Sequence, residues 1–133
     1  YLFAKQHHEL FIQRGNYRCA VTDSPLLLTA CYAAPDVTPQ SFYQCVRDYN
    51  DKFENIYFFI TRDIGAPESV FDNSGRVHNR TESLEKEKQQ RAFLDQWGVQ
   101  YTDINVTSSP NAEDDCALQI YNTLLAQNWF KKD

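Results

Sequence analysis

The stretch NIYFFIT, residues 55–61, consists almost wholly of β-branched and aromatic residues. An apolar run of this length without polar alternation is typical of a strand that helices cover on both faces, as in a parallel sheet. The run ends at Arg62 and Asp63, where charged residues begin. It therefore predicts a buried parallel strand in a chain of mixed α/β class.

Helix and strand patterns alternate on the N-terminal side of this run. The sequence predicts a helix, a buried strand with a polar tip, an apolar helix and a longer helix over residues 2–14, 17–22, 26–33 and 39 to about 53. Thr38 is the expected N-cap of the longer helix, with Pro39 at its first position.

The alternation continues on the C-terminal side. We predict a charged helix that Asn79 or Thr81 caps and that Gly98 ends, and then a strand within residues 99–106. A last helix over residues 111–129 carries acidic residues in its first turn, where the helix dipole favours negative charge. This order of elements implies parallel strands joined by right-handed helical crossovers.

A parallel sheet must be buried on both faces, and the three strands expected in the 133 residues make a poor sheet by themselves. The chain starts at Tyr1 and contains no Met, which favours a fragment of a larger domain. We therefore expect about 35 to 50 further residues before Tyr1, forming a central strand and a phosphate-binding loop.

Composition restricts the partners and the compartment. The chain has 133 residues, a net charge of −5 and four cysteines without metal-ligand spacing, which we interpret as reduced thiols in the core. Its longest apolar runs fall far short of the roughly 20 residues that cross a bilayer, and no secretory signal pattern is present. The acidic balance argues against nucleic-acid binding. We expect a cytoplasmic protein with a small-molecule substrate, and leave oligomerisation and protein partners open.

Residues 63–79 form a long connection with glycine, proline and several polar residues. Connections of this length are uncommon in compact domains unless they carry function, so we predict a lid over about residues 62–80. Arg62, Arg76 and Arg80 flank it, and its closure would bring their guanidinium groups over one polyphosphate. Alternatively, the arginines are solvated loop residues that pair with nearby carboxylates.

Several segments, taken together and in order, resemble the phage and bacterial P-loop nucleotide-kinase-like ATPases. They are Phe3-Ala4-Lys5-Gln6, Ala20-Val21-Thr22-Asp23-Ser24-Pro25-Leu26-Leu27-Leu28, Tyr32-Ala33, Phe59-Ile60-Thr61-Arg62 and Gly75-Arg76. The chain is similar to the nicotinamide riboside kinase domain of the bifunctional NAD regulator and, more distantly, to thymidylate kinases. The resemblance implies one domain over residues 1–133, a parallel three-layer α/β sandwich of the P-loop NTPase type that is incomplete at its N-terminus. No Gly-x-x-x-x-Gly-Lys-Ser/Thr motif occurs in these residues.

The resemblance also implies residue roles for ATP and Mg²⁺. Asp23, at the end of the predicted strand over residues 17–22, would order magnesium as a Walker-B-like carboxylate. The structural alternative is that Asp23 caps the next helix. Arg62 and Arg76 would stabilise the transferred phosphoryl group. Arg80, Ser108 and Ser109 would bind ATP, the two serines in a polar loop where related folds pass the adenine ring. Alternatively, this is a plain polar loop that caps the last helix and needs no ligand.

The function that follows is ATP-dependent phosphoryl transfer to a nucleoside, a nucleotide or a related small metabolite. The alternative is a regulatory or interaction protein derived from a P-loop fold, which binds nucleotide without catalysis or has lost nucleotide binding. His7 and His8 lack the i, i+4 spacing that places two imidazoles on one helical face, so no metal site is assigned to them.

Overall fold

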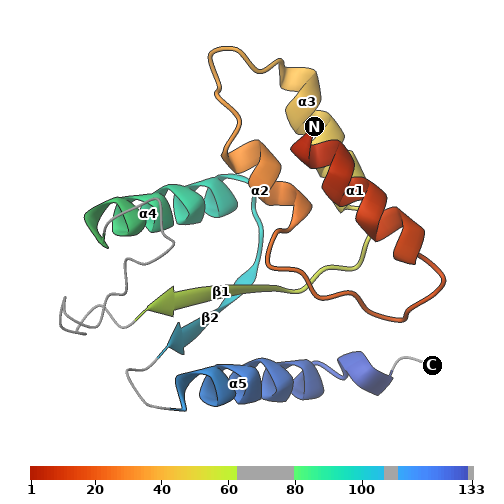
Figure 1. The fold of residues 1–133 in the computed structure, drawn as a ribbon, viewed down its shortest axis with the longest axis vertical. Coiled ribbons are helices and arrows are strands. Elements are labelled where there is room, and N and C mark those ends of the chain that lie inside the picture. Colours follow the sequence, from red (N-terminus) through yellow and green to blue (C-terminus); the bar gives the residue numbers. More distant parts are fainter. Residues whose placement is uncertain (63–79, 107–110, 132–133) are drawn as a thin grey trace. The chain divides into compact units, whose positions relative to one another are not determined.

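The computed structural model describes residues 1–62, 80–106 and 111–131 (Figure 1). The helices are α1 (Leu2–Gln13), α2 (Leu26–Cys31), α3 (Gln40–Asn50), α4 (Arg80–Gln96) and α5 (Ala112–Ala126), with a final 3₁₀ turn η2 (Trp129–Lys131). The strands are β1 (Tyr57–Arg62) and β2 (Tyr101–Val106). The chain divides into two compact units, one of residues 1–55 with 89–93 and one of residues 56–88 with 94–133.

The first unit has a helical core around α2. This six-residue helix is almost wholly apolar, and its Leu26, Leu27 and Ala30 side chains are 2–3% exposed. Val46 of α3 is fully buried with them in the same unit. The hydroxyl of Thr29 is also buried, and it donates to the carbonyl oxygen of Leu26 at 2.6 Å, so this hydroxyl is paired. A six-residue helix has low intrinsic stability, so the burial of these apolar side chains is what stabilises α2.

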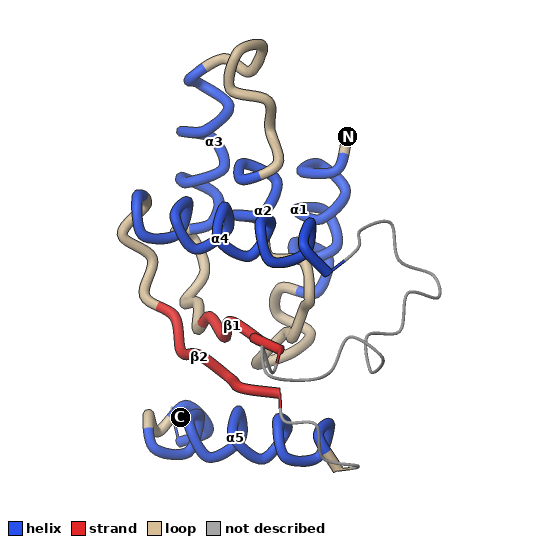
Figure 2. The backbone as a smooth tube through the Cα atoms, turned by 90° about the vertical axis from the view of Figure 1, so that its left-hand side faces the viewer, coloured by secondary structure: helices blue, strands red, loops and turns tan. Residues whose placement is uncertain are grey.

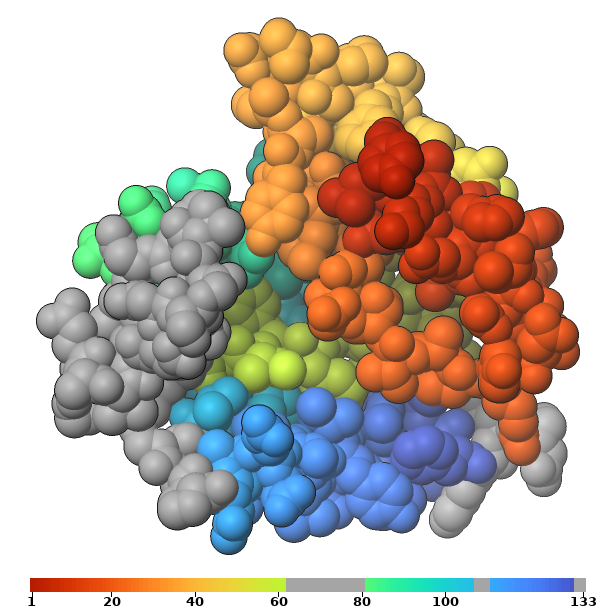
Figure 3. Space-filling model, in the orientation of Figure 1, coloured from red at the N-terminus to blue at the C-terminus, as the bar shows by residue number. Residues whose placement is uncertain are grey.

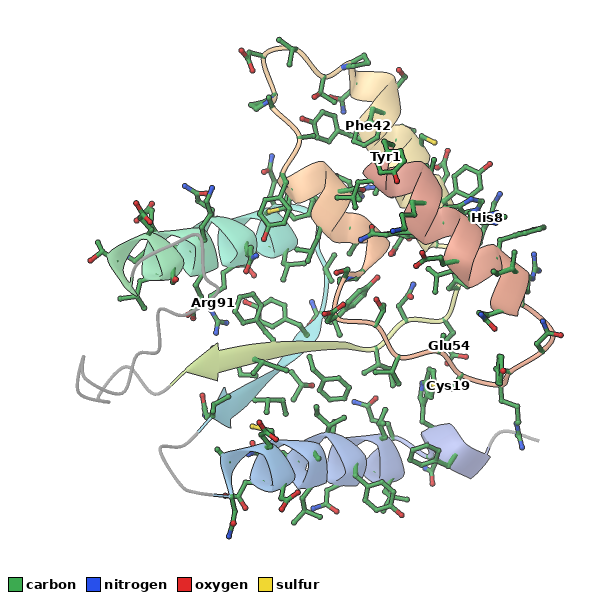
Figure 4. All side chains as sticks on the ribbon, viewed as in Figure 1. Tyr1, His8, Cys19, Phe42, Glu54 and Arg91 are labelled. Atoms are coloured by element: carbon green, nitrogen blue, oxygen red, sulfur yellow. The ribbon has the colours of Figure 1, made fainter. Side chains whose placement is uncertain are left out.

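Aromatic side chains join α1 to α3 within this unit. The ring of Phe3 meets the rings of Phe42 and Tyr49 edge-on, each with centroids 5.9 Å apart. One turn later on α1, His7 meets Tyr49 edge-on at 4.3 Å. Because residues i and i+4 lie on one helical face, a single side of α1 makes all these contacts. His7 thus has a packing role, whereas His8 lies on the exposed side of α1 (Figure 4).

The strand predicted over residues 17–22 is wrong. The chain turns after α1 at Gly15, whose φ of +85° lies in the left-handed region, and only an isolated bridge links Arg14 to Tyr17. Tyr17 and Val21 are 70% and 95% exposed. A strand needs a neighbour for its backbone groups, and the described residues place none beside this segment. The apolar run Cys19-Ala20-Val21 was too short for its pattern to decide between strand and irregular chain.

The second unit contains the sheet. β1 and β2 pair in parallel, with Tyr57 opposite Tyr101 and Arg62 opposite Val106 (Figure 2). Ile104 of β2 is 1% exposed, and α5 packs along β2. The predicted strands over 55–61 and within 99–106 and their parallel direction are confirmed. The expected burial of the first strand is not, because only Thr61 of residues 57–61 is buried and Ile60 is 57% exposed. The three-layer sandwich, which needs more strands than the two described here, stays a prediction.

The two later helices are also confirmed. α4 ends at Gln96, and Gly98 follows with a φ of +69°, as expected of a helix-ending glycine. α5 begins after Asn111 with Glu113, Asp114 and Asp115 in its first turn. It ends at Ala126 rather than at residue 129, and Asn128 with a φ of +56° separates it from η2. The outer face of α5 is open in the space-filling view (Figure 3), with Leu118 58% exposed.

The helix over residues 39–53 is confirmed with shifted ends. Pro39 is the N-cap residue and the helix runs from Gln40 to Asn50, so the N-terminus differs from the prediction by one position. None of the four cysteines forms a disulfide, as predicted, but they are not core residues. Cys19 is exposed on the segment between α1 and α2 (Figure 4), and Cys31, Cys45 and Cys116 are half-buried.

Candidate functional site

The candidate site is the edge of the sheet where β1 and β2 both end. Thr61 lies opposite Asn105, and Arg62 lies opposite Val106, so the carboxyl ends of the two strands are level. Open α/β folds bind ligands outside the carboxyl ends of their parallel strands. This edge is therefore where a ligand is expected in the second unit.

A hydrogen bond between the strands organises this edge. The Thr61 hydroxyl lies 2.7 Å from Oδ1 of Asn105 and 3.3 Å from the carbonyl oxygen of Ile104. Because a hydroxyl has one hydrogen, the shorter contact is its main donated bond. Thr61 is 8% exposed whereas Asn105 is exposed. A buried hydroxyl thus holds an amide that is accessible to solvent.

The charges at this edge are unevenly distributed. β1 ends in Arg62, whereas β2 and α5 contain the acidic residues Asp103, Glu113, Asp114 and Asp115 and no Lys or Arg. α5 begins just beyond the end of β2 (Figure 1). Asn111 follows Val106 after residues 107–110, so the two cannot be more than about 18 Å apart. The β2 side of the edge is therefore acidic.

The predicted site residues fall into three groups. Arg62 is the last residue of β1 and Arg80 is the first residue of α4, both in the second unit. Arg76, Ser108, Ser109 and the predicted lid over residues 63–79 lie outside the described residues. Asp23 belongs to the first unit.

Asp23 has neither of its two predicted settings. It lies in a bend and not at the end of a strand, and the N-cap position of α2 is occupied by Pro25, with no side-chain cap hydrogen bond. The carboxylate is exposed, and its Oδ1 accepts a hydrogen bond from the Ser24 hydroxyl at 3.1 Å. The Ser24 amide in turn donates to Oγ1 of Thr22 at 3.0 Å, which fixes the bend. An accessible carboxylate oxygen is a ligand that Mg²⁺ accepts, so the residue fits the ion chemically.

No group of three or more His, Cys, Asp or Glu side chains in the described ranges is arranged to hold a metal ion. A Mg²⁺ ion that binds chiefly through phosphates and water needs only one or two carboxylates. The helices that the structure describes include none long and apolar enough to cross a membrane.

Comparisons with protein-family models, with curated proteins and with solved structures gave no match to this chain.

Sequence reasoning missed Thr61 and Asn105 as a pair. Each is a polar residue near the end of a predicted strand, and parallel strands end at one edge. Two polar residues near the ends of two predicted parallel strands were therefore the available signal for this pair. Their direct contact depends on the register that brings together two residues 44 positions apart in the sequence, and periodicity within one strand does not supply that register.

Proposed function

We propose that this chain belongs to an ATP-dependent phosphotransferase that acts on a nucleoside, a nucleotide or a related small metabolite. The observation that carries the proposal is the level carboxyl edge of a parallel strand pair, with Thr61, Arg62 and Asn105 at its end. The resemblance to P-loop nucleotide kinases supplies the chemistry. In this proposal β1 and β2 are two strands of a larger P-loop sandwich with helices on both faces.

The chain's arginines would stabilise the transferred group. Phosphoryl transfer spreads negative charge over the equatorial oxygens of a loose transition state, and guanidinium groups that surround it lower the barrier. We assign this role to Arg62 at the end of β1 and to Arg76, with Arg80, Ser108 and Ser109 holding ATP. Asp23 would order Mg²⁺, which neutralises phosphate charge when it is bound.

A second function has one observation in its favour. Asp23 lies in an exposed bend rather than at a strand end, where P-loop enzymes usually place the metal-ordering carboxylate. This setting favours a nucleotide-binding protein that regulates a partner without transferring phosphate. We place either function in the cytoplasm, because none of the four cysteines forms a disulfide, as is usual in a reducing compartment.

The two functions are separated by turnover. The intact protein that contains this chain is incubated with ATP, Mg²⁺ and a panel of nucleosides and nucleotides, and ADP and phosphorylated product are measured. Arg62→Ala and Arg76→Ala should each lower kcat about 100-fold with little effect on ATP affinity, because they act on the transition state. Arg47→Ala, an equal charge change on α3, is the matched control and should leave kcat unchanged.

Each outcome decides between the candidates. Phosphorylated product supports the phosphotransferase. ATP binding without product supports the regulatory protein. An intact protein that neither binds nor consumes ATP refutes the phosphotransferase and leaves an interaction protein that has lost nucleotide binding.

A further inference from the structure

The Thr61–Asn105 pair has an asymmetry that sheet stability does not require. A cross-strand pair contributes to strand association through one hydrogen bond, and that bond uses Oδ1 of Asn105. The amide carries two N–H donors on its other atom, Nδ2. With Oδ1 held by a hydroxyl that is itself buried, the amide plane is fixed and its donor side is defined. This orientation favours ligand binding, because the Asn105 side chain is already ordered and loses little conformational entropy when a ligand binds.

From this geometry we infer that Asn105 is a ligand-binding residue and that Thr61 is its positioning residue. Nδ2 of Asn105 donates to a neutral acceptor on the nucleoside part of the substrate, a ring nitrogen, a carbonyl or a ribose oxygen. The inference rests on the proposed function, because it assumes that a nucleoside or nucleotide binds at this edge.

The charges around Asn105 select a neutral acceptor over a phosphate. Asp103 is two positions earlier on β2 and on the same face, about 6.6 Å along the strand. Glu113, Asp114 and Asp115 are exposed in the first turn of α5, which packs on β2. Neither β2 nor α5 contains a Lys or Arg. A polyphosphate would be repelled from the β2 side, whereas an uncharged acceptor would not.

Asn105→Asp tests the donor directly. The new carboxylate keeps an oxygen for the Thr61 hydroxyl and removes both N–H donors, so the strand pair is retained and the proposed ligand bond is lost. Binding of three probes to the intact protein is measured by calorimetry: ATP with Mg²⁺, adenosine and inorganic tripolyphosphate. Adenosine is uncharged, so weaker adenosine binding by this variant cannot come from charge repulsion.

We expect Asn105→Leu, which removes the donors without adding a charge, to leave tripolyphosphate binding within about twofold, and Asn105→Asp to weaken adenosine binding at least tenfold. Asn122→Asp on the exposed side of α5 makes the same chemical change and is the matched control. It should bind all three probes as the unaltered protein does, and the melting temperatures of both variants should agree.

Thr61→Val and Thr61→Ser test the positioning role. Thr61→Val removes the hydroxyl and should weaken adenosine binding several-fold, and Thr61→Ser should restore it. In the Asn105→Asp protein, Thr61→Val should produce no further loss, because the donor that Thr61 orients is already absent. Additive losses would show that Thr61 acts only on the sheet.

The outcomes distinguish this inference from the proposed function. If the Asn105→Asp protein binds adenosine as the unaltered protein does, this inference is overturned. If that protein still turns over ATP, the proposed function stands. In Asn105→Leu, which adds no charge, a loss of tripolyphosphate binding as large as the loss of adenosine binding overturns the assignment of a neutral acceptor. An intact protein that binds none of the three probes refutes the proposed function and this inference together.

Discussion

Two isoleucines in register provide a matched measurement of what burial contributes to the second unit. Ile60 on β1 lies directly opposite Ile104 on β2, yet Ile104 is 1% exposed and Ile60 is 57% exposed. Replacing either by Ala removes about three methylene equivalents, or about 2.4 kcal/mol of transfer free energy when the side chain is fully buried. At Ile104 a residual cavity adds to this loss, which gives about 3 kcal/mol in all.

The loss at Ile60 should be much smaller. Less than half of its side chain is withdrawn from water, and solvent can fill the space that Ala leaves, so about 1 kcal/mol is expected. Both changes exchange the same residues at paired strand positions, so the difference in β-propensity between Ile and Ala largely cancels.

Urea unfolding followed by circular dichroism measures both variants. We expect Ile104→Ala to lower the free energy of unfolding by about 2 kcal/mol more than Ile60→Ala, with equal m-values. Equal losses for the two variants would refute the burial of Ile104. A loss below about 1 kcal/mol for Ile104→Ala would do the same.

Two further predictions concern the helix end and the carboxylate. Gly98→Ala should lower the free energy of unfolding by about 1–2 kcal/mol, because φ of Gly98 is +69°; an added Cβ meets nothing within 4 Å, so the loss comes from the backbone conformation alone. Gly98→Asn should cost less, because Asn adopts this left-handed conformation more readily. Equal thermal shifts for the two variants would contradict this. Asp23→Asn should abolish magnesium-dependent turnover. The melting temperature should not change, since the Asp23 carboxylate is exposed and the Ser24 hydroxyl can donate to an amide oxygen as well. Undiminished turnover would remove Asp23 from the site.

Long and strongly patterned elements were predictable from the sequence. β1 has a continuous apolar run, α4 is followed by a glycine that ends it, and α5 has an acidic first turn. Each of these signals lies within one segment of the sequence. Residues 17–22 were not predictable in this way, because Cys19, Ala20 and Val21 suit a strand only if another strand lies beside them. Pairing is a property of the whole fold, so the short run carried no reliable signal.

The site residues differ in the same way, because some could be predicted from one segment of sequence and others depend on the whole fold. Arg62 could be predicted, because a charged residue directly after a buried strand is visible in one segment of sequence. Asn105 could not, because its significance comes from Thr61 on another strand, in register with it and hidden from solvent. A shift of the register by one residue would move both Asn105 and the Ile104 carbonyl away from the Thr61 hydroxyl. The burial of Ile104 and the polar pair Thr61–Asn105 therefore depend on one register, and the same packing that stabilises β2 also orients the amide at its end.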